Sequence, residues 1–537
     1  MKNLTVNHAL RCLTLLGLYL FSSCGATAPI LSTPIENIDQ TPVKFSTLTE
    51  EEEKNWSHFD LKKDTIPGIS LSLAYEKIVR PKSKTIIVAV IDSGIDITHE
   101  DLRENIWVNQ GEIPNNGIDD DQNGYIDDIN GWNFLGEANN EQLEYVRLLA
   151  SKNTSHPRYR EAEELYNKER KEYTGLKQQY TSILEQVNTS EKAVLDYLKK
   201  DSFSKEDVYG ITTKDPTLRQ HLSIIKQSYG FGYESIDDLK KDLEKDLKSF
   251  NERLDYNLNI DYDGRSIVND NPDDLNDKDY GNSNVMPKEG RSHGTHVTGI
   301  IAAKRNNGVG INGAADNVKI MAIRNTPNGD EYDKDVALAV YYAVDNGAKV
   351  INMSFGKGFS DHSNWVRYAI AYAGKNDVLI VAAAGNDWSN TDEVESYPDD
   401  QIGKGPEVSD TFLKVGATTY DYSSGLVAVF SNYGKSSVDV FAPGQQIYSS
   451  YPKNKYEFAQ GTSMAAPLVA GVAALIFSQY PNLNAAQVKK IIMESGLPIQ
   501  KRVSLEGGNV VEFNSLSKSG KLVNAYNALI MASKYSK

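Results

Sequence analysis

Four short segments of the sequence carry polar side chains that could act together in chemistry. Asp92 ends an apolar, β-branched run, Asn386 ends another such run, and His293 and Ser463 each stand at the start of a predicted helix. A serine hydroxyl is a weak nucleophile until a base removes its proton, and an imidazole can be that base. The carboxyl ends of parallel strands meet at one sheet edge, where ligands bind. These residue types in these places indicate nucleophilic catalysis by a serine.

Each segment also has an ordinary structural explanation when it is taken alone. Asp92 begins an Asp-Ser-Gly turn, Asn386 is a type of residue that tolerates left-handed backbone, and Ser463 could cap a helix. His293 and His296 could instead bind a metal, but the glutamate of a His-Glu-x-x-His motif is absent. The serine hypothesis therefore depends on the four segments together.

The motifs around these residues resemble those of the subtilisin-like serine proteases, the subtilases. The matching stretches read IDSGID, SHGTHVTGI, INMSFG, AAAGN and GTSMAAP, within residues 84–135 and 285–500. The resemblance implies an endopeptidase that cleaves peptide bonds through an acyl-enzyme and needs no cofactor for catalysis. It assigns a catalytic triad of Asp92, His293 and Ser463 and an oxyanion donor, Asn386.

The same resemblance implies a cleft for a protein or peptide substrate. The residues it places along that cleft, or in the wall of the first specificity pocket, are Ser354, Phe355, Gly356, Ala383, Ala384 and Gly385. It assigns His296 a structural role. A rival hypothesis is a pseudo-protease that keeps the fold and only binds partners, but the intact catalytic set argues against it.

Alternating strand and helix patterns predict the elements that must position these residues. Short apolar runs predict buried parallel strands at 85–92, 318–324, 348–354 and 377–386. Helical patterns occupy 293–304, 334–346, 363–374 and 462–479. This alternation predicts an α/β fold, a subtilisin-like doubly wound parallel sheet with helices on both faces.

Residues 141–260 interrupt this pattern and separate Asp92 from His293. Apolar residues recur there at three- and four-residue steps in two seams, from Tyr159 to Val187 and from Ile236 to Leu254. The seams predict a coiled-coil-like antiparallel helical hairpin inserted into a peptidase domain of residues 55–140 and 261–537. A solvated structural insertion is the favoured interpretation, and a protein partner for the insertion stays open.

Composition and the N-terminus bear on location and partners. The net charge of −16 argues against a nucleic-acid partner. A charged start, an apolar run and small residues predict an export signal over residues 1–23. Cys24 then resembles the lipidated cysteine of bacterial lipoproteins, with 24–54 as a tether. The expectation is an exported, membrane-anchored lipoprotein of a bacterial cell envelope, on the periplasmic or cell-surface side; the alternative is an ordinary signal peptide.

An acidic loop predicts a structural Ca²⁺ site. Its candidate ligands occupy the spacing of an EF-hand loop, with Asp128 standing in for the missing glutamate, and are Asp119, Asp121, Asn123, the carbonyl of Tyr125, and Asp128. The alternative is a solvated acidic turn. Asp101 and Asn307 are a second candidate, implied by the resemblance to a family calcium loop.

Overall fold

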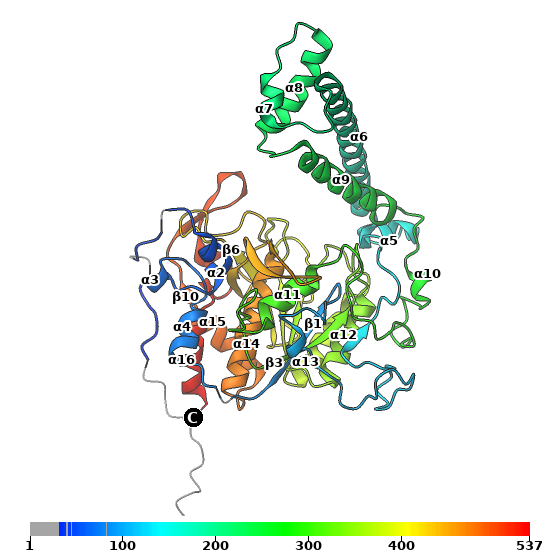
Figure 1. Ribbon diagram of the computed structural model, residues 1–537. Helices are drawn as coiled ribbons and strands as arrows, with labels where there is room; N and C mark the ends of the chain where they lie inside the picture. The colour runs from blue at the N-terminus through cyan, green and yellow to red at the C-terminus, as the bar shows by residue number, and fades with distance from the viewer. Residues whose placement is uncertain (1–31, 39–40, 45, 82, 537) are drawn as a thin grey trace, which may run out of the picture.

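The computed structural model describes residues 32–38, 41–44, 46–81 and 83–536 (Figure 1). A nine-stranded sheet has the spatial order β10-β13-β7-β6-β5-β4-β1-β3-β2. All its pairings are parallel except that of β10 with β13. Its strands are β1 (Ile86–Asp92), β2 (Gly131–Asn133), β3 (Val318–Arg324), β4 (Val350–Met353), β5 (Leu379–Ala383), β6 (Phe412–Thr418), β7 (Val440–Pro443), β10 (Leu497–Pro498) and β13 (Lys521–Leu522).

Helices cover both faces of this sheet, because successive side chains of each strand point to opposite faces. In β1, Val88 and Val90 join one apolar core, and Ala89 and Ile91 join a second. The first core contains α11 (His293–Ala302), α14 (Thr462–Gln479), α15 (Ala485–Ser495) and α16 (Ala525–Tyr535); the second contains α12 (Asp333–Asp345) and α13 (Ser363–Lys375). The predicted doubly wound α/β fold is confirmed. We call the sheet and these helices the α/β body.

The segment between β2 and α11 carries a helical arm that projects from the α/β body (Figure 1). Its helices are α5 (Glu144–Ala150), α6 (Tyr159–Leu198), α7 (Lys205–Gly210), α8 (Pro216–Gly230) and α9 (Ile236–Glu252). The pairs Glu191–Lys240 and Glu169–Arg253 join α6 to α9 and its C-terminal continuation in opposite chain order. The two long helices are therefore antiparallel, as the two seams predict.

The arm has two parts, which we call the tip and the root. The tip has an apolar core of its own, built from the later half of α6 and from α7, α8 and α9. In the root, α5 and the first turns of α6 share a cluster with Phe359 of the α/β body. Lys357 is buried there, and its Nζ lies 2.7 Å from Glu144 and 3.0 Å from Asp333. The root is thus packed as part of the α/β body.

The described N-terminal residues also pack on the α/β body. Ile38 and Trp56 are each only 1 % exposed. The backbone of Ile35 donates to Asn527 Oδ1 at 2.8 Å and accepts from its Nδ2 at 2.9 Å. Within the expected tether, Ile35 is therefore held against α16. The expected signal segment and Cys24 lie outside the described residues.

One described helix, α14, is long and apolar enough to cross a membrane. Its side chains are almost all buried among the strands and helices of the α/β body. Within the described part of the chain, α14 is the core helix of this fold.

Candidate active site

Asp92 and His293 form a hydrogen-bonded pair at the carboxyl edge of the sheet. Asp92 ends β1 and is 1 % exposed, while His293 begins α11. His293 Nδ1 lies 2.9 Å and 3.0 Å from the two carboxylate oxygens. Gly294 permits this approach, because a Cβ there would lie 2.4 Å from the Gly94 carbonyl oxygen. The imidazole is held with Nδ1–H on the carboxylate, which leaves Nε2 as the proton acceptor.

Two opposing effects set the protonation of His293. Burial of the ring disfavours the imidazolium, but the charge of Asp92 and its hydrogen bond outweigh burial and raise the pKa of His293 above its usual 6.5. His296, one turn further along α11, has its pKa lowered to about 4, chiefly by burial. Its Nε2 lies 3.1 Å from the Glu457 carbonyl oxygen, so it is placed in the core.

Ser463 is the second residue of α14 and faces the end of β4. Its Oγ donates to the carbonyl of Ser354 at 3.0 Å, and Ser354 Oγ donates to the carbonyl of Ser463 at 2.9 Å. That carbonyl is free to accept because Pro467, four residues on, has no N–H to give it. Among the described residues no hydrogen bond joins Ser463 to His293. The structure thus presents Asp92–His293 as a formed pair and Ser463 in a separate contact.

Asn386 is oriented by the residue just before Ser463. Its Oδ1 accepts from the backbone N–H of Thr462 at 2.8 Å and from the Thr462 hydroxyl at 3.1 Å. The amide therefore turns its Nδ2 donor away from these groups, and the residue is exposed. The backbone N–H of Ser463 lies in the first turn of α14, where N–H groups lack intrahelical acceptors. Two N–H donors and the helix dipole suit a developing oxyanion. Thr462 was not among the residues predicted from the sequence, although it directly precedes Ser463.

The residues expected along the substrate cleft meet at the same sheet edge because β4 pairs with β5. Phe355, Gly356 and Gly385 are at least partly exposed, whereas Ala383 and Ala384 are buried. A cleft of about 300 Å³ opens at this edge, and of the six expected residues only Ser354 lines it. Its lining includes Asp92, His293 and Ser354 together with Arg291 and Asn328.

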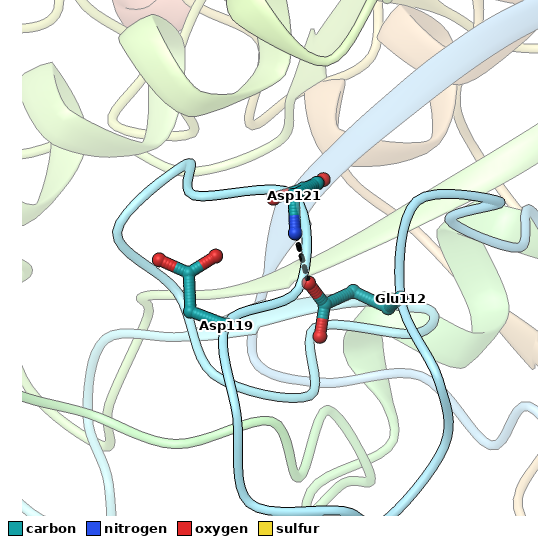
Figure 2. A group of neighbouring side chains, drawn as sticks. All are labelled: Glu112, Asp119 and Asp121. Carbon is teal, nitrogen blue, oxygen red and sulfur yellow. Dashed lines mark hydrogen bonds between the residues drawn. The ribbon is translucent and has the colours of Figure 1, made fainter.

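The acidic loop brings three carboxylates together (Figure 2). Glu112, Asp119 and Asp121 have ligand atoms within 4.8 Å of one another. Glu112 lies seven residues before Asp119, outside the EF-hand spacing, so the sequence pattern missed it. Oxygen donors of this kind fit a hard cation such as Ca²⁺.

Asp128 has a different setting from these three carboxylates. It accepts from the Tyr342 hydroxyl at 2.6 Å and from Asn123 Nδ2 at 3.1 Å, and burial raises its pKa to about 6. The ring of Tyr125 packs against Tyr342. In the second candidate, Asn307 Nδ2 donates to Asp101 at 2.7 Å. Asp101 and Asn307 therefore meet, but this pair has one carboxylate, whereas the first cluster has three.

The amino-acid sequence is similar to those of known serine proteases. The Subtilase family model matches residues 83–511. The chain is 37 % identical over 254 residues to a thermophilic serine proteinase of Bacillus sp. strain AK1, covering 47 % of this chain and 55 % of that protein. It is 40 % identical over 202 residues to thermitase of Thermoactinomyces vulgaris, covering 37 % of this chain and 66 % of that protein.

Among solved structures, proteases from Pseudoalteromonas arctica match with 30 % identity and a TM-score of 0.37, covering 45 % of this chain and 70 % of that one. The chain spans about half the length of the Bacillus proteinase and 23 % of a cell wall-associated protease of Bacillus subtilis. The family model covers most of the chain, including β1, α11, β4, β5 and the start of α14, so this protein belongs to the subtilase family.

Proposed function

We propose that this subtilase is a serine endopeptidase that hydrolyses protein or peptide substrates. The observation that carries the proposal is the Asp92–His293 pair, held at the sheet edge beside the cleft, with Ser463 at the N-terminus of α14. Ser463 Oγ attacks the substrate carbonyl while His293 Nε2 takes its proton. His293 then gives that proton to the leaving amine, and Asp92 stabilises the imidazolium in between. Water, deprotonated by His293, attacks the resulting acyl-enzyme, and His293 returns the proton to Ser463 as the acid product leaves.

Asn386 Nδ2 and the backbone N–H of Ser463 donate to the oxyanion of the tetrahedral intermediate. Thr462 is a positioning residue, because its N–H and hydroxyl hold the acceptor oxygen of Asn386 and so direct the donor to the cleft. The segment 354–356, directly after β4, pairs its backbone with an extended peptide, which requires Ser463 Oγ to release the Ser354 carbonyl. Substrate binding and activation of Ser463 are thereby linked.

Labelling with a serine-directed phosphonate tests this function. The wild type should be labelled, and Ser463→Ala should not. Ser478→Ala, at the other end of α14, is the matched control and should be labelled like the wild type. A pseudo-protease would leave the wild type unlabelled, and a histidine-dependent metal hydrolase would keep its activity in Ser463→Ala and lose it with a chelator.

We further propose that Glu112, Asp119 and Asp121 hold a structural Ca²⁺, which would screen three carboxylates whose ligand atoms lie within 4.8 Å. We also propose export and lipid anchoring at Cys24, supported by the apolar run and small residues before it. Cys24→Ser should move the protein from the membrane fraction to the soluble fraction. Unchanged detergent partitioning would show an ordinary export signal.

A further inference from the structure

A hydrogen-bonded partition separates the catalytic cleft from a groove beneath α9. On the cleft side stand Arg291, two residues before His293, and Asn328. On the groove side stand Asn140 and Glu252, the last residue of α9. Glu252 Oε2 accepts from Arg291 at 3.3 Å and from Asn328 Nδ2 at 3.0 Å. The end of α9 therefore supports two residues of the cleft wall from the groove side.

The groove is large enough to take part of a polypeptide and is negatively charged. Its volume is about 420 Å³, and its lining includes Leu247 and the charged residues Glu244, Lys248, Glu252 and Asp255. Three carboxylates face one ammonium there, so the groove favours cations over anions.

Glu252 is the groove carboxylate that contacts the lining of the cleft, through Arg291 and Asn328. Its side chain is 28 % exposed, and Arg291 beside it is 19 % exposed. Both bonds from the partition fall on Oε2, and among the described residues Oε1 has no hydrogen-bond partner. Glu252 and Arg291 balance each other in charge, so the net negative charge of the groove comes from Glu244 and Asp255 against Lys248, while Oε1 of Glu252 stays open as an acceptor.

We propose that Glu252 is a specificity-determining residue that selects substrates with a lysine or arginine near the scissile bond. The substrate cation binds Oε1 of Glu252 at the partition, and the chain beyond it continues into the groove beneath α9. This inference rests on the proposed peptidase function, and it assigns the arm a part in substrate choice. Hydrogen bonds between a cation and a carboxylate predict a preference of roughly tenfold over a glutamate-containing substrate.

Binding can be measured separately from catalysis in the Ser463→Ala protein. Fluorescent peptides that share one cleavable sequence would carry Lys, Gln or Glu at successive positions around the scissile bond. Fluorescence anisotropy should give a Kd for the best Lys peptide roughly tenfold lower than for its Glu counterpart, and 1 M salt should weaken the preference. Glu252→Gln should reduce this ratio to about three or lower, because the carboxylate charge is lost and Arg291 is left without its ion-pair partner. Glu185→Gln, an exposed change on α6 outside the groove, should keep the full ratio.

Glu252→Lys should reverse the preference, so that the Glu peptide binds more tightly than the Lys peptide, which a merely structural role of Glu252 would not produce. Each ratio of Kd values is measured on one protein, so it does not depend on the amount of folded material. Equal ratios in the Ser463→Ala, Glu252→Gln and Glu252→Lys backgrounds would overturn the inference. Hydrolysis by the wild type tests the peptidase function itself, so a failure of that function remains distinguishable from a failure of this proposal.

Discussion

The α/β body and the tip of the helical arm use charge in opposite ways. In the α/β body, the side chains of Asp92 and Lys357 are each 1 % exposed and are held by partners from distant parts of the chain. In the tip, Lys240 and Glu191 pair at 2.7 Å but are each 21 % exposed. Solvent screens the second pair, whereas a buried charge must keep its partner. Buried charges in the α/β body therefore fix the positions of the side chains that they pair with. Charges in the tip contribute little, because its apolar core already stabilises the packing of its helices.

The largest effect is expected at Asp92. Asp92→Asn removes the charge that orients His293 and raises its pKa, so kcat on a small peptide should fall by about 10⁴. Only neutral imidazole accepts the serine proton, so wild-type kcat/KM should rise with pH through a value above 6.5. In Asp92→Asn the residual activity should also increase with pH, but the increase should occur at a lower pH than in the wild type.

The check is the pH dependence of kcat/KM between about pH 5 and 9. Asp410→Asn, an exposed carboxylate of the α/β body, should keep the wild-type profile. If the rise of kcat/KM with pH occurs at the same pH in Asp92→Asn as in the wild type, the charge of Asp92 is not what raises the pKa of His293.

A second experiment contrasts the two lysines directly. Lys357→Met leaves Asp333 buried without its cation and Glu144 paired with Arg147 alone, which should lower the free energy of unfolding by about 3–5 kcal/mol. Lys240→Met in the tip should cost no more than about 1 kcal/mol. Urea denaturation of both variants measures the difference. Equal losses of unfolding free energy in the two variants would show that the ion pairs of the root and of the tip contribute equally to stability.

The next largest effect is expected from Ca²⁺ binding at the acidic loop of the α/β body, measured as a change in thermal stability. Ca²⁺ that binds only the folded protein adds about 2.7 kcal/mol at a hundredfold excess over Kd, so chelation should lower the melting temperature. Asp119→Asn/Asp121→Asn should abolish the response, and Asp101→Asn should retain it. Melting curves with chelator and with millimolar Ca²⁺ decide between the two loops. A response lost in Asp101→Asn instead would place the ion at the second candidate.

The smallest effect is expected from removing the tip alone. Replacing residues 178–247 by a short Gly-Ser linker removes a core that the tip forms by itself and keeps Glu144 in the root. Activity on a small peptide should change by no more than about twofold, because few packing contacts of the α/β body are lost. Deleting 141–260 also removes Glu144 and Leu143 and should destabilise the α/β body. If both deletions behave alike, the root is not part of its packing.

Much of the fold could be predicted because it depends on local patterns. Strand β3 was expected at 318–324 and occupies those residues, and α14 was expected at 462–479 and does the same. Buried parallel strands and apolar helices leave short, dense signals in sequence. The pairing of α6 with α9 followed from two seams of matching period.

The sequence by itself determined which residues are available for catalysis, since Asp92, His293, Asn386 and Ser463 stand in recognisable motifs. Only the tertiary structure decided their surroundings. Glu112 joins the acidic loop from outside its pattern, and Glu252 contacts two cleft-wall residues that lie 39 and 76 residues away in the chain. Motifs arise from local backbone requirements, whereas these contacts arise from the path of a loop and from part-buried hydrogen bonds between separate segments, whose partners no motif spacing specifies.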